Sequence, residues 1–144
     1  MAKLFWFALA SFGLAGCTTN DPPSGSYTTS VSGQTCNTST ATTIAFAGTT
    51  ISVTYSGYDP PTTVTATNDM FDGDKVTFDS MVAGGNIDTG DMASGIEHYN
   101  VTVDGNTLSG TVDAMYNGTK NAMHYECTST LGVTGTRATT RRSP

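Results

Sequence analysis

The sequence predicts an all-β fold of about eight antiparallel strands, arranged as a meander that forms a small barrel or a two-sheet sandwich. Three observations support this prediction. Apolar residues recur at every second position in short runs, turn-forming residues separate these runs, and no window after the N-terminal segment has the 3.6-residue period of an amphipathic helix. The composition agrees, because only 12% of the residues are charged and the abundant Thr suits a pleated surface.

Each expected strand carries apolar residues with a period of two. Tyr27 and Val31 share one face of the first strand, and Tyr125, Cys127 and Leu131 share one face of the last strand. The expected strands are centred, in chain order, on residues 27–33, 44–46, 51–55, 64–66, 76–78, 99–103, 108–114 and 123–131. Short connections between consecutive strands predict hairpins, and therefore an antiparallel sheet.

Glycine-containing turns separate several of these strands. Asp72-Gly73-Asp74, Asp104-Gly105-Asn106 and Asn117-Gly118 each predict a hairpin turn, because Asn, Asp and Gly tolerate the positive φ angles that two-residue turns require.

One connection is expected to be much longer than the others. The segment Val82–Ile96 reads VAGGNIDTGDMASGI and predicts a loop in a chain of otherwise short turns. Long loops on a rigid scaffold often carry binding residues. We therefore expect a candidate binding loop here, with Asn86, Asp88, Asp91 and Met92 as its contact residues.

The N-terminal segment has the pattern of an export signal. Lys3 supplies a positive charge, and the apolar run Leu4–Ala15 follows it. As a helix this run would be about 18 Å long, against about 30 Å for the hydrocarbon core of a bilayer. It is therefore too short for an ordinary transmembrane helix, and we expect residues 1–16 to be a signal peptide.

The apolar run ends in Leu14-Ala15-Gly16-Cys17. This tetrapeptide resembles the lipobox of bacterial lipoproteins that are processed by signal peptidase II, with an aliphatic residue, two small residues and a cysteine. The resemblance covers residues 1–17, and it implies cleavage between Gly16 and Cys17 and lipidation of Cys17. Two or more acyl chains hold a protein stably on a membrane.

The resemblance also implies a location. Thr18 stands where an Asp favours inner-membrane retention in lipoproteins of enteric-type bacteria. We therefore expect an exported protein that is lipid-anchored to the outer membrane of the cell envelope. The sequence leaves open whether it faces the cell surface or the periplasm.

The remaining chain divides into three parts. Residues 17–26 comprise the lipidated cysteine and a flexible tether rich in Pro, Ser and Asn. Residues 27–137 are the expected β domain. Residues 138–144 are an expected disordered tail that carries Arg141 and Arg142.

Two cysteines remain after Cys17 is used for lipid. Cys36 and Cys127 form an even pair in an oxidising exported setting, which predicts a disulfide bond. Closing a loop of about ninety residues stabilises a fold by roughly 4–5 kcal/mol in the chain-entropy model. A bridge between the first and last strands suits a sheet that closes on itself, although a sandwich can also bring them together.

The two ends of the domain resemble lipocalin-like barrels. Gly25-Ser26-Tyr27 stands where that family has Gly-x-Trp, and Gly135-Thr136-Arg137 stands where it places a basic residue from the last strand over the Trp ring. Tyr27 replaces the Trp here, and the central Thr-Asp-Tyr-type motif of the family is absent from the sequence. This resemblance implies a small apolar ligand.

The chain is also similar in size, anchor and cysteine pair to the lysozyme-inhibitor lipoproteins, which are small disulfide-stapled barrels. The recognition motif of that family, built around a Ser-Gly-x-Arg/Lys-Tyr element, is absent from the sequence, and the segment Ser94–Tyr99, SGIEHY, resembles it only in a distorted form. This resemblance implies inhibition of an attacking hydrolase such as lysozyme.

No motif in the sequence predicts catalysis. Glu97 and His98 are adjacent, and neighbouring residues of a strand point to opposite faces, so they should not act together. We expect both, like His124, to face solvent. The methionines at positions 70, 81, 92, 115 and 123 are expected to fill the core. We expect neither a metal nor another cofactor, since the cysteines and histidines lack ligand spacing.

The charge pattern excludes one class of partner. The net charge is −6 and most acidic residues lie within the β domain, whereas nucleic-acid binding needs a clustered cationic face. We therefore expect a non-enzymatic binding domain for a small apolar ligand or an envelope protein partner. A structural or surface role without a ligand is the alternative.

Overall fold

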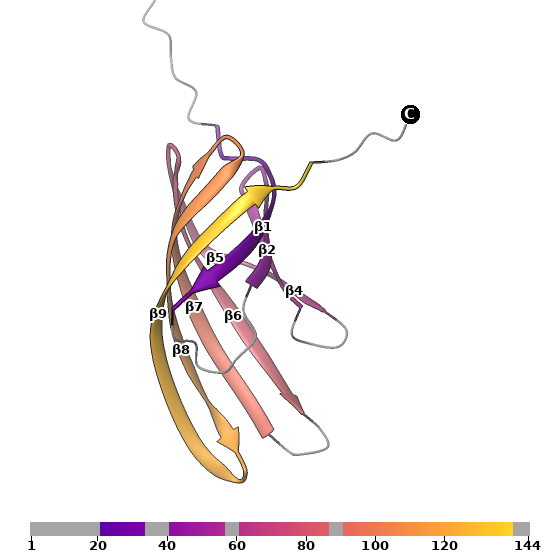
Figure 1. Ribbon diagram of the computed structural model, residues 1–144, viewed down its shortest axis with the longest axis vertical. Helices are drawn as coiled ribbons and strands as arrows, with labels where there is room; N and C mark the ends of the chain where they lie inside the picture. Colours follow the sequence, from indigo (N-terminus) through magenta and orange to yellow (C-terminus); the bar gives the residue numbers. More distant parts are fainter. Residues whose placement is uncertain (1–20, 34–40, 57–60, 87–90, 140–144) are drawn as a thin grey trace, which may run out of the picture.

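The computed structural model describes residues 21–33, 41–56, 61–86 and 91–139. They form an all-β, nearly closed barrel, as the sequence predicts, with nine antiparallel strands in place of about eight (Figure 1). Among these residues there is no helix that is long and apolar enough to cross a membrane. The strands are β1 (Gly25–Ser32), β2 (Ala41–Ala47), β3 (Thr50–Tyr55), β4 (Thr62–Thr65), β5 (Thr67–Asp72), β6 (Lys75–Asn86), β7 (Asp91–Asp104), β8 (Thr107–Lys120) and β9 (Met123–Arg137).

The sheet curls because its first and last strands pair. The strand order is β4-β3-β2-β1-β9-β8-β7-β6-β5. Val31 of β1 lies opposite Val133 of β9. The two edge strands, β4 and β5, are separated only by Ala66, whose amide donates to the Ile51 carbonyl at 2.8 Å. One bent segment therefore pairs with β3 through its first half and with β6 through its second half, which nearly closes the barrel.

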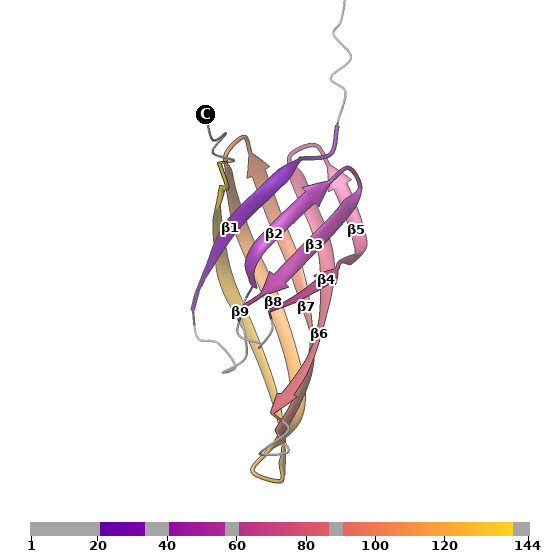
Figure 2. The same ribbon diagram turned by 90° about the vertical axis from the view of Figure 1, so that its right-hand side faces the viewer.

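Four strands extend well beyond this barrel. β6 to β9 contain 12 to 15 residues, whereas β1 to β5 contain 4 to 8. β1 stops pairing with β9 at Ser32↔Gly132, and β5 stops pairing with β6 at Thr67↔Asp79. We call the four-stranded continuation the arm, and it comprises residues 80–86, 91–97, 114–120 and 123–129 (Figure 2).

Both ends of the described chain leave the barrel at the end opposite the arm (Figure 1). The Ala138 amide donates to the Ser26 carbonyl at 2.7 Å, and the Arg137 amide donates to the Asn106 carbonyl at 2.8 Å. The turn at Gly105 is at this end too, because the Tyr27 hydroxyl donates to its carbonyl at 2.8 Å. The arm therefore points away from the position at which the N-terminal segment reaches the barrel.

Aromatic rings fill the middle of the barrel. Tyr27 and Phe46 meet edge to face with 5.9 Å between ring centroids, Phe46 and Phe78 do so at 6.5 Å, and Phe78 stacks on Tyr99 at 4.7 Å. The alternation of buried and exposed residues that the sequence predicts is present along these strands. The aliphatic side chains that complete this core include Ile44, Ile51, Val53, Val76, Val101, Leu108, Val112, Leu131 and Val133.

The expected long loop at Val82–Ile96 is wrong. Val82 pairs with Gly95 and Asn86 pairs with Asp91, so most of the segment belongs to strands β6 and β7. Small residues occupy many of these positions, and they conceal the period of two on which a strand prediction depends. Of the expected contact residues, Asn86, Asp91 and Met92 lie within strands, and Asp88 lies outside the described residues.

The expected turn at Asn117-Gly118 is also wrong. Both residues belong to β8, and the chain reverses four residues later at Asn121 and Ala122. These two residues have φ angles of 52° and 62°. Two positive φ angles in succession give the turn twist that suits a β-hairpin, so β8 and β9 are longer than their sequence indicates.

Candidate functional site

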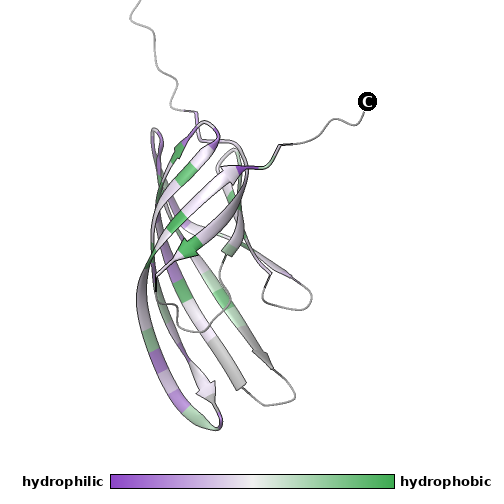
Figure 3. Cartoon of the chain, in the orientation of Figure 1, coloured by the Kyte–Doolittle hydropathy of each residue, from purple (hydrophilic) through white to green (hydrophobic). Residues whose placement is uncertain are grey.

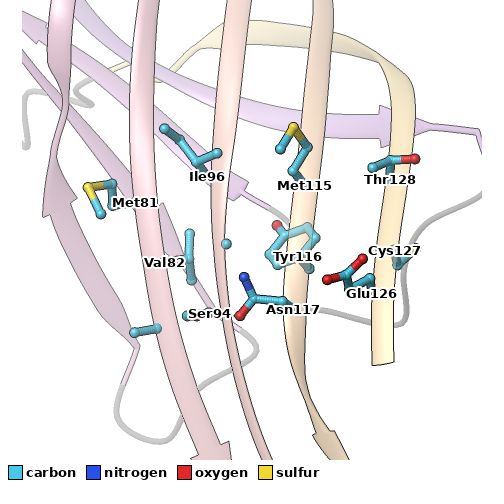
Figure 4. Close-up of a pocket in the computed structure, with 12 residues that line it drawn as sticks. Met81, Val82, Ser94, Ile96, Met115, Tyr116, Asn117, Glu126, Cys127 and Thr128 are labelled. Carbon is cyan, nitrogen blue, oxygen red and sulfur yellow. Dashed lines mark hydrogen bonds between the residues drawn. The ribbon is translucent and has the colours of Figure 1, made fainter. Parts of the chain in front are cut away.

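The outer face of the arm carries a hollow of about 430 Å³. Two parallel rows of side chains from β6, β7, β8 and β9 border it (Figure 4). The upper row contains Met81, Ile96, Met115 and Thr128, which are consecutive cross-strand partners. The lower row contains Ala83, Ser94, Asn117 and Glu126, also in register.

Three members of the upper row form an exposed apolar strip, which we call the apolar row. Met81 is 66% exposed, Ile96 37% and Met115 60%. Their neighbours in sequence, including Val82 and Tyr116, are buried on the inner face. Side chains of successive strand residues point to opposite faces, which places the apolar row outside.

The methionines are therefore not core filler. Met70 and Met123 are 67% and 69% exposed, and with Met81 and Met115 they contradict the expectation from the sequence. The side chain of Met92 is outside the described part. The apolar character of methionine suggests burial, but a strand residue faces inwards only if it lies an even number of positions from another inward-facing residue. This spacing was the signal in the sequence that could have placed the methionines outside.

Polar side chains line the opposite border of the hollow. The Ser94 hydroxyl donates to the Asn117 side-chain oxygen at 3.1 Å. The Glu126 side chain is 80% exposed, and its carboxylate lies 3.6 Å from His124 Nε2. His124 therefore faces solvent as expected, and Glu126 gives this border a negative charge.

A second acidic group borders the apolar row on the barrel side. Asp79, His98 and Asp113 are consecutive partners across β6, β7 and β8. Asn68 Nδ2 donates to the Asp79 carboxylate at 2.7 Å, and His98 Nδ1 lies 2.6 Å from the same group. The Asn68 and His98 contacts lower the pKa of Asp79, so it is a stable anion at neutral pH.

Asp113 accepts a hydrogen bond at 2.6 Å from the Thr130 hydroxyl on the next strand. Between this level and the arm tips, the outer-face side chains that the structure describes include acidic residues and histidines but no lysine or arginine. Asp79 and Asp113 on one side and Glu126 on the other therefore place acidic groups on both borders of the apolar row.

The inner face at the base of the arm holds a buried carboxylate. Glu97 is only 4% exposed, and three tyrosine hydroxyls donate to it. Tyr55 and Tyr99 reach one carboxylate oxygen at 2.6 and 2.5 Å, and Tyr116 reaches the other oxygen. We call these four residues the tyrosine–glutamate network. It joins β3 on one side of the barrel to β7 and β8 on the other.

The hydroxyl of Tyr55 also lies 2.9 Å from the Ser80 hydroxyl. A phenol has one proton, and a carboxylate can only accept. Tyr55 therefore donates to Glu97 and accepts from Ser80. Among the described residues, no buried side-chain nitrogen or oxygen lacks a hydrogen-bond partner.

The surroundings keep these phenols protonated. Burial raises the pKa of Tyr55 and of Tyr99, and the charge of Glu97 raises both further. The expectation that Glu97 faces solvent is wrong. Glu97 and His98 do point to opposite faces, as predicted, so they do not form an acid–base pair.

Glu97 was missed because the network depends on register. Tyr55 is 42 residues from Glu97 and Tyr116 is 19 residues away, and nothing local in the sequence links them. The ring of Tyr116 fills the space that a side chain at Gly95 would occupy, because a Cβ at Gly95 would lie 2.2 Å from the ring. The described part of the chain contains no group of three His, Cys, Asp or Glu side chains that could hold a metal ion.

Several expected site residues lie outside the described residues, namely Gly16, Cys17, Cys36 and Asp88. Cys127 lies in β9 and Cys36 lies outside the described residues, so the disulfide between them stays a prediction.

The lipocalin-like resemblance concerned both ends of the domain. Tyr27 and Arg137 are direct cross-strand partners. The guanidinium of Arg137 lies against Gly25, within 2.5 Å of where a Cβ would be. The segment Ser94–Tyr99 lies within β7.

Fold and surface together define an all-β, barrel-like protein with an extended arm, whose outer face carries a hollow with one mainly apolar and one polar border. The chain matches no protein-family model, no curated protein and no solved structure.

Proposed function

We propose that the chain is an exported, lipid-anchored envelope protein whose β domain is a non-enzymatic binding module. The arm engages a protein partner through the hollow on its outer face. The observation that carries this proposal is the apolar row, which is exposed on three adjacent strands at the end of the molecule opposite the N-terminal attachment.

The lipobox at Leu14-Ala15-Gly16-Cys17 supports the anchor. Residues 18–24 would then connect the acylated cysteine to β1, a reach of at most about 25 Å when fully extended. Because β1 begins at the end opposite the arm (Figure 1), such a tether leaves the arm directed away from the membrane. A partner in the surrounding space would meet the arm first.

A partner on the outer face is favoured over a small ligand inside the barrel. Tyr27, Phe46, Phe78 and Tyr99 are each at most 3% exposed and occupy the interior in a continuous series of ring contacts. The hydropathy of the ribbon shows apolar segments within the arm as well as in the barrel (Figure 3). Exposed apolar groups that lie together are typical of interaction sites.

We further propose that Cys127 pairs with Cys36. Val31 lies opposite Val133 and Ser32 lies opposite Gly132. Cys127 lies in β9, the strand that pairs with β1, and Cys36 follows the end of β1 by four residues in the sequence.

Metabolic labelling with an alkyne fatty acid tests the anchor. We expect label on the wild-type chain and none on Cys17→Ser. An unlabelled wild-type chain, or equal labelling of both forms, would refute lipidation of Cys17.

Site-specific photocrosslinking in cells tests the binding role. A photoreactive residue at Met115 should give a discrete crosslinked band to an envelope protein, whereas one at Met70, equally exposed and away from the hollow, should not. Absence of a band from both positions, or the same band from both, would contradict binding through the arm.

A further inference from the structure

We infer that the hollow on the arm binds an extended segment of a cationic protein, in which apolar side chains alternate with lysine or arginine. The inference rests on the proposed binding function and adds the chemistry of the partner. It follows from the position of the apolar row between acidic groups on two sides.

The apolar row supplies the contact for the apolar side chains. Neighbouring strands are about 4.8 Å apart, so the distance from Met81 on β6 to Met115 on β8 is about 10 Å. Three or four residues of an extended chain cover this length. Methionine side chains are flexible and polarisable and adapt to different apolar partners.

The acidic groups select the charge of the partner. Asp79 and Asp113 lie one row above the apolar row, and Glu126 lies one row below it. Alternate residues of one strand face are about 7 Å apart. A basic side chain next to an apolar one in the partner can therefore reach Asp113 or Glu126 while its neighbour contacts the apolar row. Asp79, whose side chain is 14% exposed and is held by Asn68 and His98, adds its charge without a direct contact.

The same charges argue against other occupants. A second copy of this chain would place Asp79, Asp113 and Glu126 near the like charges of its partner, which is unfavourable. Anionic lipid headgroups and nucleic acid would be repelled for the same reason. A cationic protein segment is the occupant that fits both the apolar strip and its acidic borders.

The test uses methyl resonances of methionine as direct reporters. The mature chain, acylated at Cys17 and labelled with ¹³C at the methionine methyl groups, is reconstituted through its lipid anchor in nanodiscs of neutral phosphatidylcholine. A five-residue peptide of alternating lysine and leucine is titrated in, and a peptide of alternating glutamate and leucine is the charge control.

We expect the lysine–leucine peptide to shift the Met81 and Met115 resonances saturably, and to leave those of Met70 and Met123 in place. The double variant Met81→Gln/Met115→Gln should weaken binding by at least about tenfold, and Met70→Gln/Met123→Gln should change it by less than about twofold. Added salt should weaken binding, because the charged contacts are exposed.

Four results would overturn the inference. They are no saturable shift, equal shifts at all four reporters, equal binding of the glutamate–leucine peptide, and self-association through Met81 and Met115 in the absence of peptide. The proposed function would survive any of them if Cys17 is acylated and the Met115 crosslink forms in cells. A missing crosslink would instead refute the binding role itself.

Discussion

Replacement of Tyr55 by phenylalanine tests whether Glu97 is a charged acceptor in the core. The change removes one hydroxyl and keeps the ring. The lost hydrogen bond, of 2.6 Å, goes to a carboxylate oxygen. Hydrogen bonds to charged groups contribute about 1.5–3 kcal/mol to stability, against about 0.5–1.5 kcal/mol for neutral pairs.

Tyr27→Phe is the matched control. The Tyr27 side chain is 1% exposed and that of Tyr55 is 0% exposed, so both variants lose a hydroxyl from a buried site. The Tyr27 hydroxyl donates to a neutral carbonyl, that of Gly105, at 2.8 Å. The two variants therefore differ in the charge of the acceptor and in the Ser80 hydroxyl, which loses its own acceptor only in Tyr55→Phe.

We expect Tyr55→Phe to lower the free energy of unfolding by about 2–3 kcal/mol and Tyr27→Phe by about 1 kcal/mol. The upper part of the range applies to Tyr55 because Ser80, which is 0% exposed, loses the acceptor for its own proton. At about 4 °C per kcal/mol for a domain of this size, the melting temperature should fall by about 8–12 °C and about 4 °C respectively.

Urea unfolding of the full chain, followed by circular dichroism, measures both values. Ser80→Ala in the Tyr55→Phe background should add no further loss, since the serine proton is already without its acceptor. Equal losses for Tyr55→Phe and Tyr27→Phe would refute the assignment of Glu97 as a charged acceptor.

Three further predictions concern the same fold. Glu97→Gln should lower the free energy of unfolding by about 2–3 kcal/mol, because three phenols then face a neutral amide. Glu126→Gln, at an exposed site, should change the free energy of unfolding by less than about 0.5 kcal/mol. Similar urea midpoints for the two variants would contradict the tyrosine–glutamate network. The pKa values of Tyr55 and Tyr99 are raised in the fold, so the stability that these residues contribute is present below about pH 10, where unfolded tyrosine ionises, and is lost above that pH. Absorbance at 295 nm should show the ionisation of Tyr55 and Tyr99 only together with alkaline unfolding. Ionisation of all tyrosines before the protein unfolds would refute this prediction. Cys36→Ser and Cys127→Ser should each lower the free energy of unfolding by about 2–5 kcal/mol, and the double variant should lose no more than either single one; a free Cys36 thiol in the oxidised wild-type chain would exclude the pairing.

The barrel could be predicted because the alternation of apolar and polar residues within each of its strands shows which side chains face inwards. Tyr27 and Val31 alternate with Thr28 and Ser30, and the structure buries the first two more than the others. The bridge expected between Cys36 and Cys127 suited a sheet that closes on itself, and in the structure β1 and β9 pair, although the sequence left a sandwich open. These features depend on one strand at a time, or on the general preference of sheets to avoid open edges.

The arm could not be predicted in the same way. Its strands contain Ala83, Gly84, Ala93, Ser94 and Gly95, which have little or no apolar side chain to reveal a period of two. Their strand state depends on pairing with long neighbours, and such pairing is a tertiary effect that overrides weak local preference.

The tyrosine–glutamate network was hidden for a different reason. Carboxylates are rarely buried without partners, and the partners of Glu97 come from distant parts of the chain. Tyr55 reaches it across the barrel from β3, and Tyr116 reaches it from β8. Only the register of the sheet brings these groups together.

Methionine oxidation in intact cells tests most directly the claim that the arm is a contact surface. In the purified full chain, Met81 and Met115, which are 66% and 60% exposed, should be oxidised by dilute hydrogen peroxide at rates close to those of Met70 and Met123, which are 67% and 69% exposed. In cells, with mass spectrometry as the readout, we expect Met81 and Met115 to be oxidised several-fold more slowly than Met70 and Met123. The same four relative rates in cells and in the purified chain would contradict a partner on the outer face of the arm.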